Sequence, residues 1–186
     1  VLDLGIALDD TALPHMAVVS GVFEGVALRI ARISFTGERS YEISVPADRA
    51  VALWARLRQA GEAFGARLLG LEALMILRAE KGYIVIGKDT DGTSRPMDFG
   101  LTAPLERKKV EFIGRRSLLT EDAALADRRQ FVGLEAIDDK GLLPTGAHGI
   151  EPSSAGLRST GYVTSSYFSP ALQKPIALGL IERGLA

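Results

Sequence analysis

Apolar and polar positions alternate along much of the first half of the chain, which is the pattern of half-buried β-strands. Residues 22–35 alternate strongly and slip in phase once at Ile30, which predicts one long strand with a bulge. Turn-forming residues follow at 36–39, and residues 41–45 alternate again. The pattern therefore predicts a β-hairpin whose second strand carries one carboxylate, Glu42, on the face opposite its apolar side chains.

Helical periods follow the predicted hairpin. Residues 47–60 carry apolar side chains at intervals of three and four, and we expect Trp54 on this stripe to be a core residue. Residues 71–80 predict a second helix, for which Gly82 is the expected C-cap. These helices are expected to cover the antiparallel sheet. The apolar run at 83–86 predicts a short, fully apolar strand.

The C-terminal part of the chain shows no helical period. Short apolar runs at 131–136, 161–167 and 176–181 are separated by turn residues, which predicts a small all-β unit. The predicted fold class is therefore α+β. Residues 1–125 are expected to hold an antiparallel sheet with covering helices, and residues 126–186 a small β-barrel.

Composition narrows the function classes. The 186 residues contain no Cys, which excludes disulfides, thiolate metal sites and a Cys nucleophile, and only two His, so we expect no metal site. A net charge of −1 and basic clusters without interleaved aromatic residues give no indication of a nucleic-acid partner. No apolar run approaches the ~20 residues of a membrane span, and no signal peptide is visible, so we expect a cytoplasmic protein. The chain begins with Val1 rather than Met, which we interpret as a fragment of a longer chain.

Two short motifs look like ligand loops, but their details do not fit. The stretch GYIVIGKD is close to a phosphate-binding loop, but Asp89 stands where Ser or Thr should hold magnesium. The stretch DTDG that begins at Asp89 has the wrong spacing for a calcium loop. We interpret the inner residues of the first stretch as strand formers and the second stretch as a surface turn. We interpret the basic clusters as solvated faces or as a rim for an anionic ligand tail.

Glu42 allows more than one interpretation. One wet strand face is common and would explain an exposed carboxylate without any ligand. A carboxylate facing a cleft is also suited to a pterin or similar heterocycle, which presents an amine and a ring N–H side by side. A charge-assisted pair of this kind is about twice as strong as a neutral one.

Four ordered stretches carry a resemblance to a known family. They are SFTGERSYEISVP, GLEALMILRAEKGYIVIGKDTDG, KKVEFIGRRSL and GYVTSSYFSPALQKPIALGLI. Together they resemble the folate-binding region shared by the glycine-cleavage T-protein (aminomethyltransferase), dimethylglycine dehydrogenase and the α subunit of heterotetrameric sarcosine oxidase. RAEKGYIVIGKDTDGT and VTSSYFSPAL make the sequence most similar to the sarcosine oxidase α subunit.

The resemblance implies a set of folate-binding residues. Glu42 matches a family Glu that contacts folate. Tyr41 and Tyr83 are candidate neighbours, but both could equally be core residues with a satisfied hydroxyl. Arg78 matches an Arg that the family motif keeps. Leu74 stands where T-proteins have an Arg that helps to bind folate, which disfavours T-protein activity. The family's catalytic Asp lies N-terminal to the matching region, so no catalytic residue is identified here.

The resemblance also implies a function. The chain is expected to be the C-terminal tetrahydrofolate-binding part of a sarcosine oxidase α subunit, where the one-carbon unit from sarcosine yields 5,10-methylenetetrahydrofolate. FAD or FMN, NAD and the other sarcosine oxidase subunits would belong to the parent complex, and the fragment alone would be inactive. The alternatives are a T-protein aminomethyltransferase or a non-catalytic folate-binding module, although KGYIVIGKD lacks the Cys that is usual in such modules.

Overall fold

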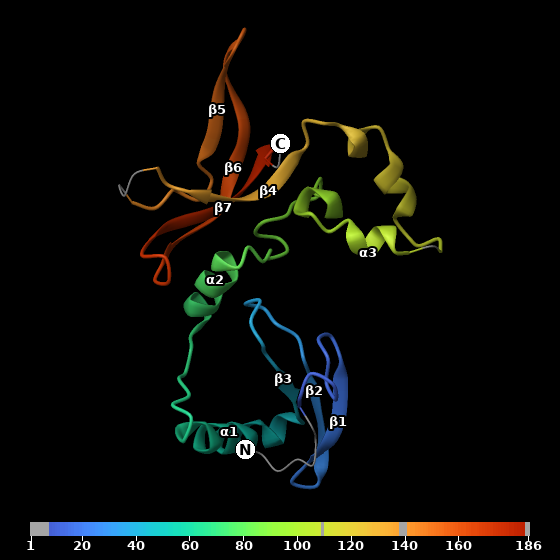
Figure 1. Cartoon of the computed structure of the whole chain (residues 1–186), viewed down its shortest axis with the longest axis vertical. Coiled ribbons are helices and arrows are strands. Elements are labelled where there is room, and N and C mark those ends of the chain that lie inside the picture. Colours follow the sequence, from blue (N-terminus) through green and yellow to red (C-terminus); the bar gives the residue numbers. More distant parts are fainter. Residues whose placement is uncertain (1–7, 109, 138–140, 185–186) are drawn as a thin grey trace. The chain divides into compact units, whose positions relative to one another are not determined.

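The computed structural model describes residues 8–108, 110–137 and 141–184 of the chain. It divides into two compact units, Val1–Met75 and Ile76–Ala186. The division falls within helix α2, Leu71–Glu80, and each unit is described by itself (Figure 1). None of the helices in the described residues is long and apolar enough to cross a membrane.

The first unit is built on a three-stranded antiparallel sheet of order β1-β2-β3. Its strands are β1 (Val18–Phe23), β2 (Val26–Ala31) and β3 (Glu42–Ser44). The prediction of one long strand over 22–35 is wrong, because the chain reverses between β1 and β2. Glu24 and Gly25 have φ of 47° and 81°, which is the geometry of a two-residue hairpin turn.

The predicted hairpin of residues 22–45 is present as the β2–β3 pair, in which Ile30 lies opposite Ile43. The interior of this unit is apolar, and its buried residues are Leu13, Phe23, Leu28, Ile30 and Leu53. Leu53 comes from helix α1 (Ala50–Glu62), which follows a short 3-10 turn at Ala47–Arg49. Helix α1 thus packs on the sheet, as predicted, whereas helix α2, the second expected cover, contributes no residue to this cluster.

Trp54 is not part of this core. Its side chain remains 51% exposed, so the prediction that it is buried is wrong. The side of α1 that meets the sheet is narrow: Leu53 is buried and Leu57 is partly buried, while Trp54 lies one position around the helix from Leu53. The apolar stripe in the sequence is therefore wider than the surface that the sheet covers.

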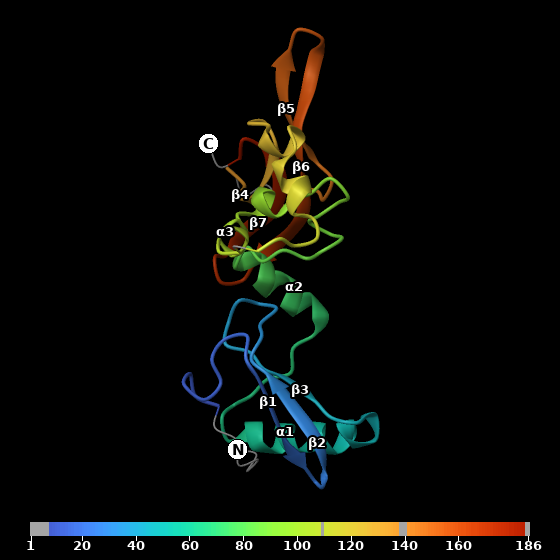
Figure 2. The same cartoon turned by 90° about the vertical axis from the view of Figure 1, so that its right-hand side faces the viewer.

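The second unit contains a four-stranded antiparallel sheet of order β4-β7-β6-β5. Its strands are β4 (Arg129–Glu135), β5 (His148–Ser153), β6 (Gly156–Ser169) and β7 (Lys174–Glu182). Three of them were predicted. β5 was not, because it is a mostly exposed edge strand that contains Gly and Pro and pairs only with β6. The β5–β6 hairpin extends beyond the rest of the sheet (Figures 1 and 2).

Irregular chain and short helices connect α2 to β4. The helical pieces are Pro96–Phe99, α3 (Ala103–Glu106), Arg115–Leu119 and Asp122–Ala124. The strand predicted at 83–86 is absent. The backbone N–H groups of Lys88 and Asp89 both donate to the carbonyl of Val85, which closes a turn instead. The α+β class is confirmed, while the predicted boundary between residues 125 and 126 stays a prediction.

Candidate functional site

Glu42 lies on β3, an edge strand of the first sheet. Tyr41 and Ile43, its neighbours along the chain, turn toward the core and pack against it, while Glu42 is exposed. Among the residues that the structure describes, the Glu42 carboxylate has no hydrogen-bond or ion-pair partner. The alternation predicted from the sequence thus places an unpaired acceptor on the outer face of the strand.

Tyr41 supports this strand from its inner face. Its ring packs against the apolar core, and its hydroxyl donates to the carbonyl oxygen of Leu8 at 3.0 Å. The hydroxyl is therefore already occupied by the chain itself. Tyr41 and Glu42 are brought together by sequence adjacency, but their side chains lie on opposite faces of β3.

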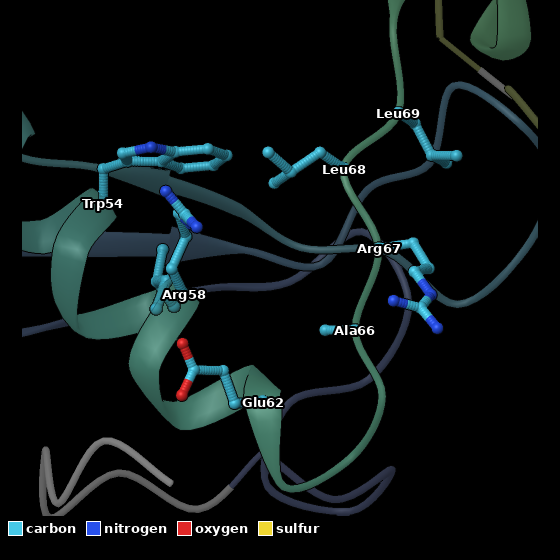
Figure 3. A pocket seen from close by; sticks show the side chains of 8 residues that line it. Trp54, Arg58, Glu62, Ala66, Arg67, Leu68 and Leu69 are labelled. Carbon is cyan, nitrogen blue, oxygen red and sulfur yellow. The ribbon is translucent and has the colours of Figure 1, made fainter.

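A separate hollow lies beside α1, with a volume of about 560 Å³ (Figure 3). Ligand pockets are commonly 300–1,000 Å³, so its size alone would suit a small molecule. Trp54 on the helix faces Leu68 on the following segment, with Arg58 and Glu62 nearby. None of the residues predicted to bind folate lines this hollow, and its wall is largely exposed apolar surface.

Arg78 and Tyr83 belong to the second unit, where Arg78 is completely buried. One terminal guanidinium nitrogen of Arg78 donates to Asp89 Oδ2 at 2.6 Å and to the backbone carbonyl of Tyr83 at 3.1 Å. The other donates to Ser165 Oγ at 2.6 Å. Both terminal nitrogens of this predicted folate residue are thus bound within the protein.

Asp89 is the centre of this cluster and is also fully buried. Besides Arg78, its Oδ2 accepts the backbone N–H of Val85 at 2.9 Å. Its Oδ1 accepts the hydroxyls of Thr164 at 2.5 Å and Ser165 at 2.8 Å. Sequence reasoning missed this role, since Ser165 is 76 positions away from Asp89. The sequence showed only a charged residue, Asp89, shortly after the apolar run at 83–86.

Tyr83 follows α2 directly, and its side chain is 42% exposed. Gly82 has φ of 74° and ends the helix, which confirms its predicted role as a C-cap. Further along the same segment, Lys88 Nζ donates to the hydroxyl of Tyr167 at 2.9 Å. The structure therefore brings Arg78 to the backbone of Tyr83 and leaves the Tyr83 ring partly open to solvent.

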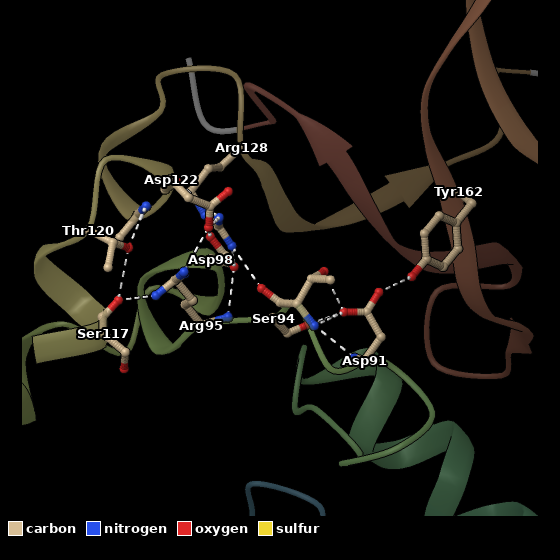
Figure 4. Close-up of polar contacts among 11 residues, drawn as sticks. Asp91, Ser94, Arg95, Asp98, Ser117, Thr120, Asp122, Arg128 and Tyr162 are labelled. Atoms are coloured by element: carbon tan, nitrogen blue, oxygen red, sulfur yellow. Dashed lines mark hydrogen bonds and ion pairs between the residues drawn. The ribbon is translucent and has the colours of Figure 1, made fainter. Parts of the chain in front are cut away.

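A second polar cluster joins the loop after Asp89 to the start of β4 (Figure 4). Arg128 donates to both carboxylate oxygens of Asp98, at 2.8 and 2.6 Å, and to Asp122. The hydrogen bonds that Arg128 donates to the Asp98 carboxylate raise the pKa of Arg128 above its usual value. Arg95 completes the cluster by donating to Asp122 at 2.7 Å. Each charged group in this cluster is paired with an opposite charge, so we interpret the cluster as a structural link between these segments.

Asp91 lies at the edge of the same region (Figure 4). The hydroxyl of Thr93, followed by its backbone N–H, lowers the pKa of Asp91 to about 2. Tyr162 donates to the same carboxylate at 3.2 Å, and burial raises the pKa of that phenol. Within the described ranges, no group of three or more His, Cys, Asp or Glu side chains is arranged to hold a metal ion.

Comparison with known families matches two successive parts of the chain. The GCVT N-terminal domain matches residues 2–109, which is more than half of the chain. The glycine cleavage T-protein C-terminal barrel domain matches residues 129–186. The chain belongs to the glycine cleavage T-protein family. The resemblance inferred from the four sequence stretches is thereby confirmed.

Relatives within this family include two kinds of enzyme. The sarcosine oxidase subunit alpha of Corynebacterium sp. (strain P-1) is 39% identical over 164 residues, which is 86% of this chain and 17% of the relative. The aminomethyltransferase of Caldanaerobacter subterraneus subsp. tengcongensis is 36% identical over 158 residues, or 85% of this chain and 41% of the relative. This chain thus spans less than half the length of either relative.

A solved structure gives the same assignment. The glycine cleavage system aminomethyltransferase T from Bartonella henselae aligns with a TM-score of 0.68 at 29% identity. The alignment covers 83% of this chain and 42% of that one. The α+β fold with a C-terminal barrel-like domain is therefore that of the T-protein family. The folate-binding roles of Glu42, Tyr41, Tyr83 and Arg78 stay predictions.

Proposed function

We propose that this chain is the tetrahydrofolate-binding part of a larger enzyme of the sarcosine oxidase α type. In that enzyme, the one-carbon unit released from sarcosine would be passed to tetrahydrofolate to give 5,10-methylenetetrahydrofolate and water. Support comes from family membership and from the 39% identity to a sarcosine oxidase subunit alpha. FAD or FMN, NAD and the remaining subunits would act elsewhere in the parent complex.

The observation that carries the proposal is the unpaired carboxylate of Glu42. The Glu42 carboxylate is exposed on an edge strand whose other face is packed, so both of its oxygens are free to accept hydrogen bonds from a ligand. A pterin offers an amine and a ring N–H side by side, and a carboxylate can accept both. Glu42 fits that ligand as a bidentate acceptor, with Tyr41 bracing the strand behind it.

The chain's own contribution would be binding and orientation. Folate nitrogen supplies the nucleophile that captures the one-carbon unit. Holding the pterin edge on Glu42 fixes that nitrogen in one place, and orientation of this kind can contribute several kcal/mol to a reaction. No residue described in this chain needs to form a covalent bond in this scheme.

Aminomethyltransferase activity is the second candidate, because aminomethyltransferases also match across most of this chain. Leu74 argues against it, since an apolar side chain stands where T-proteins use an Arg toward folate. The upstream sequence of the intact protein discriminates the two. A G-x-G-x-x-G dinucleotide-binding motif there would support the oxidase type.

The test is calorimetric titration of folinate into the intact protein that contains this chain. Glu42→Gln keeps the shape of the side chain but replaces an acceptor by a donor that faces the ligand's own N–H groups. We expect binding to weaken by about 2–4 kcal/mol. Sarcosine oxidation should continue in this variant, with free formaldehyde released in place of methylenetetrahydrofolate.

Glu24→Gln is the matched control, because it changes another exposed carboxylate, in the turn between β1 and β2. It should leave folinate affinity unchanged. Both variants should melt at the wild-type temperature, since neither side chain is buried. Equal folinate affinity in the Glu42→Gln variant and the wild type would return Glu42 to the role of a solvated strand residue.

A further inference from the structure

The segment of residues 83–88 combines an irregular backbone with exposed apolar side chains. Tyr83 is 42% exposed and Ile86 is 77% exposed, although the sequence of this run would suit a buried strand. An irregular, exposed and apolar segment has few packing contacts to hold it, so such segments usually belong to the least stable parts of a protein. Here its backbone is instead fixed from the interior of the second unit.

Buried polar groups bind this segment at both of its ends. Arg78 donates to the carbonyl of Tyr83 at 3.1 Å, and Asp89 Oδ2 accepts the N–H of Val85 at 2.9 Å. Lys88 at the far end donates to the hydroxyl of Tyr167 at 2.9 Å. The Arg78–Asp89 pair therefore binds backbone atoms of the segment, and these hydrogen bonds involve none of its side chains.

A bulge in β6 completes the anchor. Val163 pairs with Gly179 and Ser165 with Leu178, so Thr164 has no partner in the β6–β7 ladder. Successive residues of a regular strand point to opposite faces. At this bulge, however, the hydroxyls of Thr164 and Ser165 both donate to Asp89 Oδ1. Bulges often redirect a side chain in this way beside functional sites.

The physical cost of this arrangement indicates that it does more than stabilise. A buried ion pair commonly contributes no more than well-packed apolar residues would, because both charges must leave water. What the pair adds is a preferred geometry, because a hydrogen bond weakens steeply when its donor–hydrogen–acceptor angle departs from linear. A geometry of this kind is suited to holding one loop conformation.

We propose that Arg78 and Asp89 are positioning residues, which hold residues 83–88 in one conformation so that the Tyr83 ring is presented to the ligand. The choice of tetrahydrofolate as that ligand rests on the proposed function, whereas the rigidity of the segment does not. Arg78 would then serve the ligand indirectly, through the Tyr83 backbone, because its terminal nitrogens are bound within the protein.

Hydrogen exchange in the intact protein without ligand tests the anchor. The backbone N–H groups of Val85, Lys88 and Asp89 are the reporters, because each is hydrogen-bonded in this turn. Ser165→Ala should speed their exchange about tenfold by removing one donor to Asp89. Ser166→Ala is the matched control, since the neighbouring hydroxyl has no hydrogen-bond partner in the structure. Equal exchange in both variants would overturn the proposal.

A double-mutant cycle tests whether the anchor acts through Tyr83. Arg78→Lys keeps the charge but cannot reach all three partners of the guanidinium, and it should weaken folinate binding to the intact protein about tenfold. In a Tyr83→Ala background the same change should cause no further loss. Additive losses would contradict positioning through Tyr83. If the wild-type protein does not bind folinate, the proposed function fails, and the exchange experiment alone decides on the anchor.

Discussion

The interiors of the two units differ in kind. The first unit is held by an apolar cluster in which Leu28 and Ile30 of β2 meet Leu53 of α1. The second unit buries apolar residues of β7 as well, but it also encloses the charged pair Arg78 and Asp89 at 0% exposure. Each interior therefore depends on different physics. Apolar burial is non-directional and tolerates repacking, while a buried ion pair requires fixed partners.

This difference matters for how each unit can carry a site. The first unit presents Glu42 on a strand whose position follows from packing on its other face. In the second unit, the segment at 83–88 is irregular, and packing alone does not fix its conformation. The hydrogen bonds of Asp89 fix the backbone of this segment. A regular element can rely on its core, whereas a loop needs specific polar anchors.

The largest expected effect comes from breaking the ion pair. Asp89→Ala leaves Arg78 buried without a counter-charge, which should destabilise the second unit by about 3–5 kcal/mol. Replacing both partners, with Arg78→Met and Asp89→Leu, should recover much of this loss, because no charge remains buried. The measurement is the denaturant dependence of hydrogen exchange at the amides of β6 and β7.

The first unit provides the counterpart with a purely apolar change. Leu28→Ala should cost about 3 kcal/mol, through lost burial and the cavity that it leaves. The only tryptophan in the sequence, Trp54, lies in this unit, so its fluorescence follows unfolding of the first unit. Val22→Ala, at a strand position that is 61% exposed, is the control and should stay within about 0.5 kcal/mol. Similar losses for both variants would contradict the assigned core.

Elements that depend on a pattern within a few neighbouring residues could be predicted from the sequence. The α2 bounds, the capping role of Gly82 and the alternation around Glu42 all depend on residues within one helix or strand. The turn at Glu24 was missed because it is only two residues long, although Gly25 and the break in alternation at Glu24-Gly25 were signals for it. Local patterns thus predicted where elements lie better than where they end.

The polar anchor could not be predicted in the same way. Asp89 meets Thr164 and Ser165, which are 75 and 76 positions further along the chain. Their convergence also requires a bulge, and hydroxyl-bearing residues in a strand carry no mark that distinguishes a bulged position. The predicted strand at 83–86 failed for a related reason, because a buried carboxylate overrides the strand preference of an apolar run.

A smaller effect is expected from pH, at Asp91 of the second unit. Its pKa is lowered from the ordinary value of an Asp side chain to about 2, first by the Thr93 hydroxyl. A lowered folded-state pKa means that this carboxylate stabilises the fold above pH ~4, and that the contribution is lost as the pH falls toward 2. In the Asp91→Asn variant, the melting temperature of the second unit should therefore fall less between pH 4 and pH 2 than in the wild type. Since Asp91 is exposed, the change should be modest, and an unaltered acid profile would contradict it.

The smallest effect is expected at Trp54, the residue that the sequence pattern placed in the core. Its side chain is 51% exposed in the first unit, so Trp54→Ala removes little buried surface from this chain. We expect a loss of about 1 kcal/mol or less, whereas Leu53→Ala at the adjacent, buried position should cost about 3 kcal/mol. Thermal unfolding followed by circular dichroism measures both variants without the tryptophan signal. If Trp54→Ala destabilised the first unit as much as Leu53→Ala, the whole apolar stripe of α1 would be buried. The core of the first unit would then be larger than the five residues assigned to it.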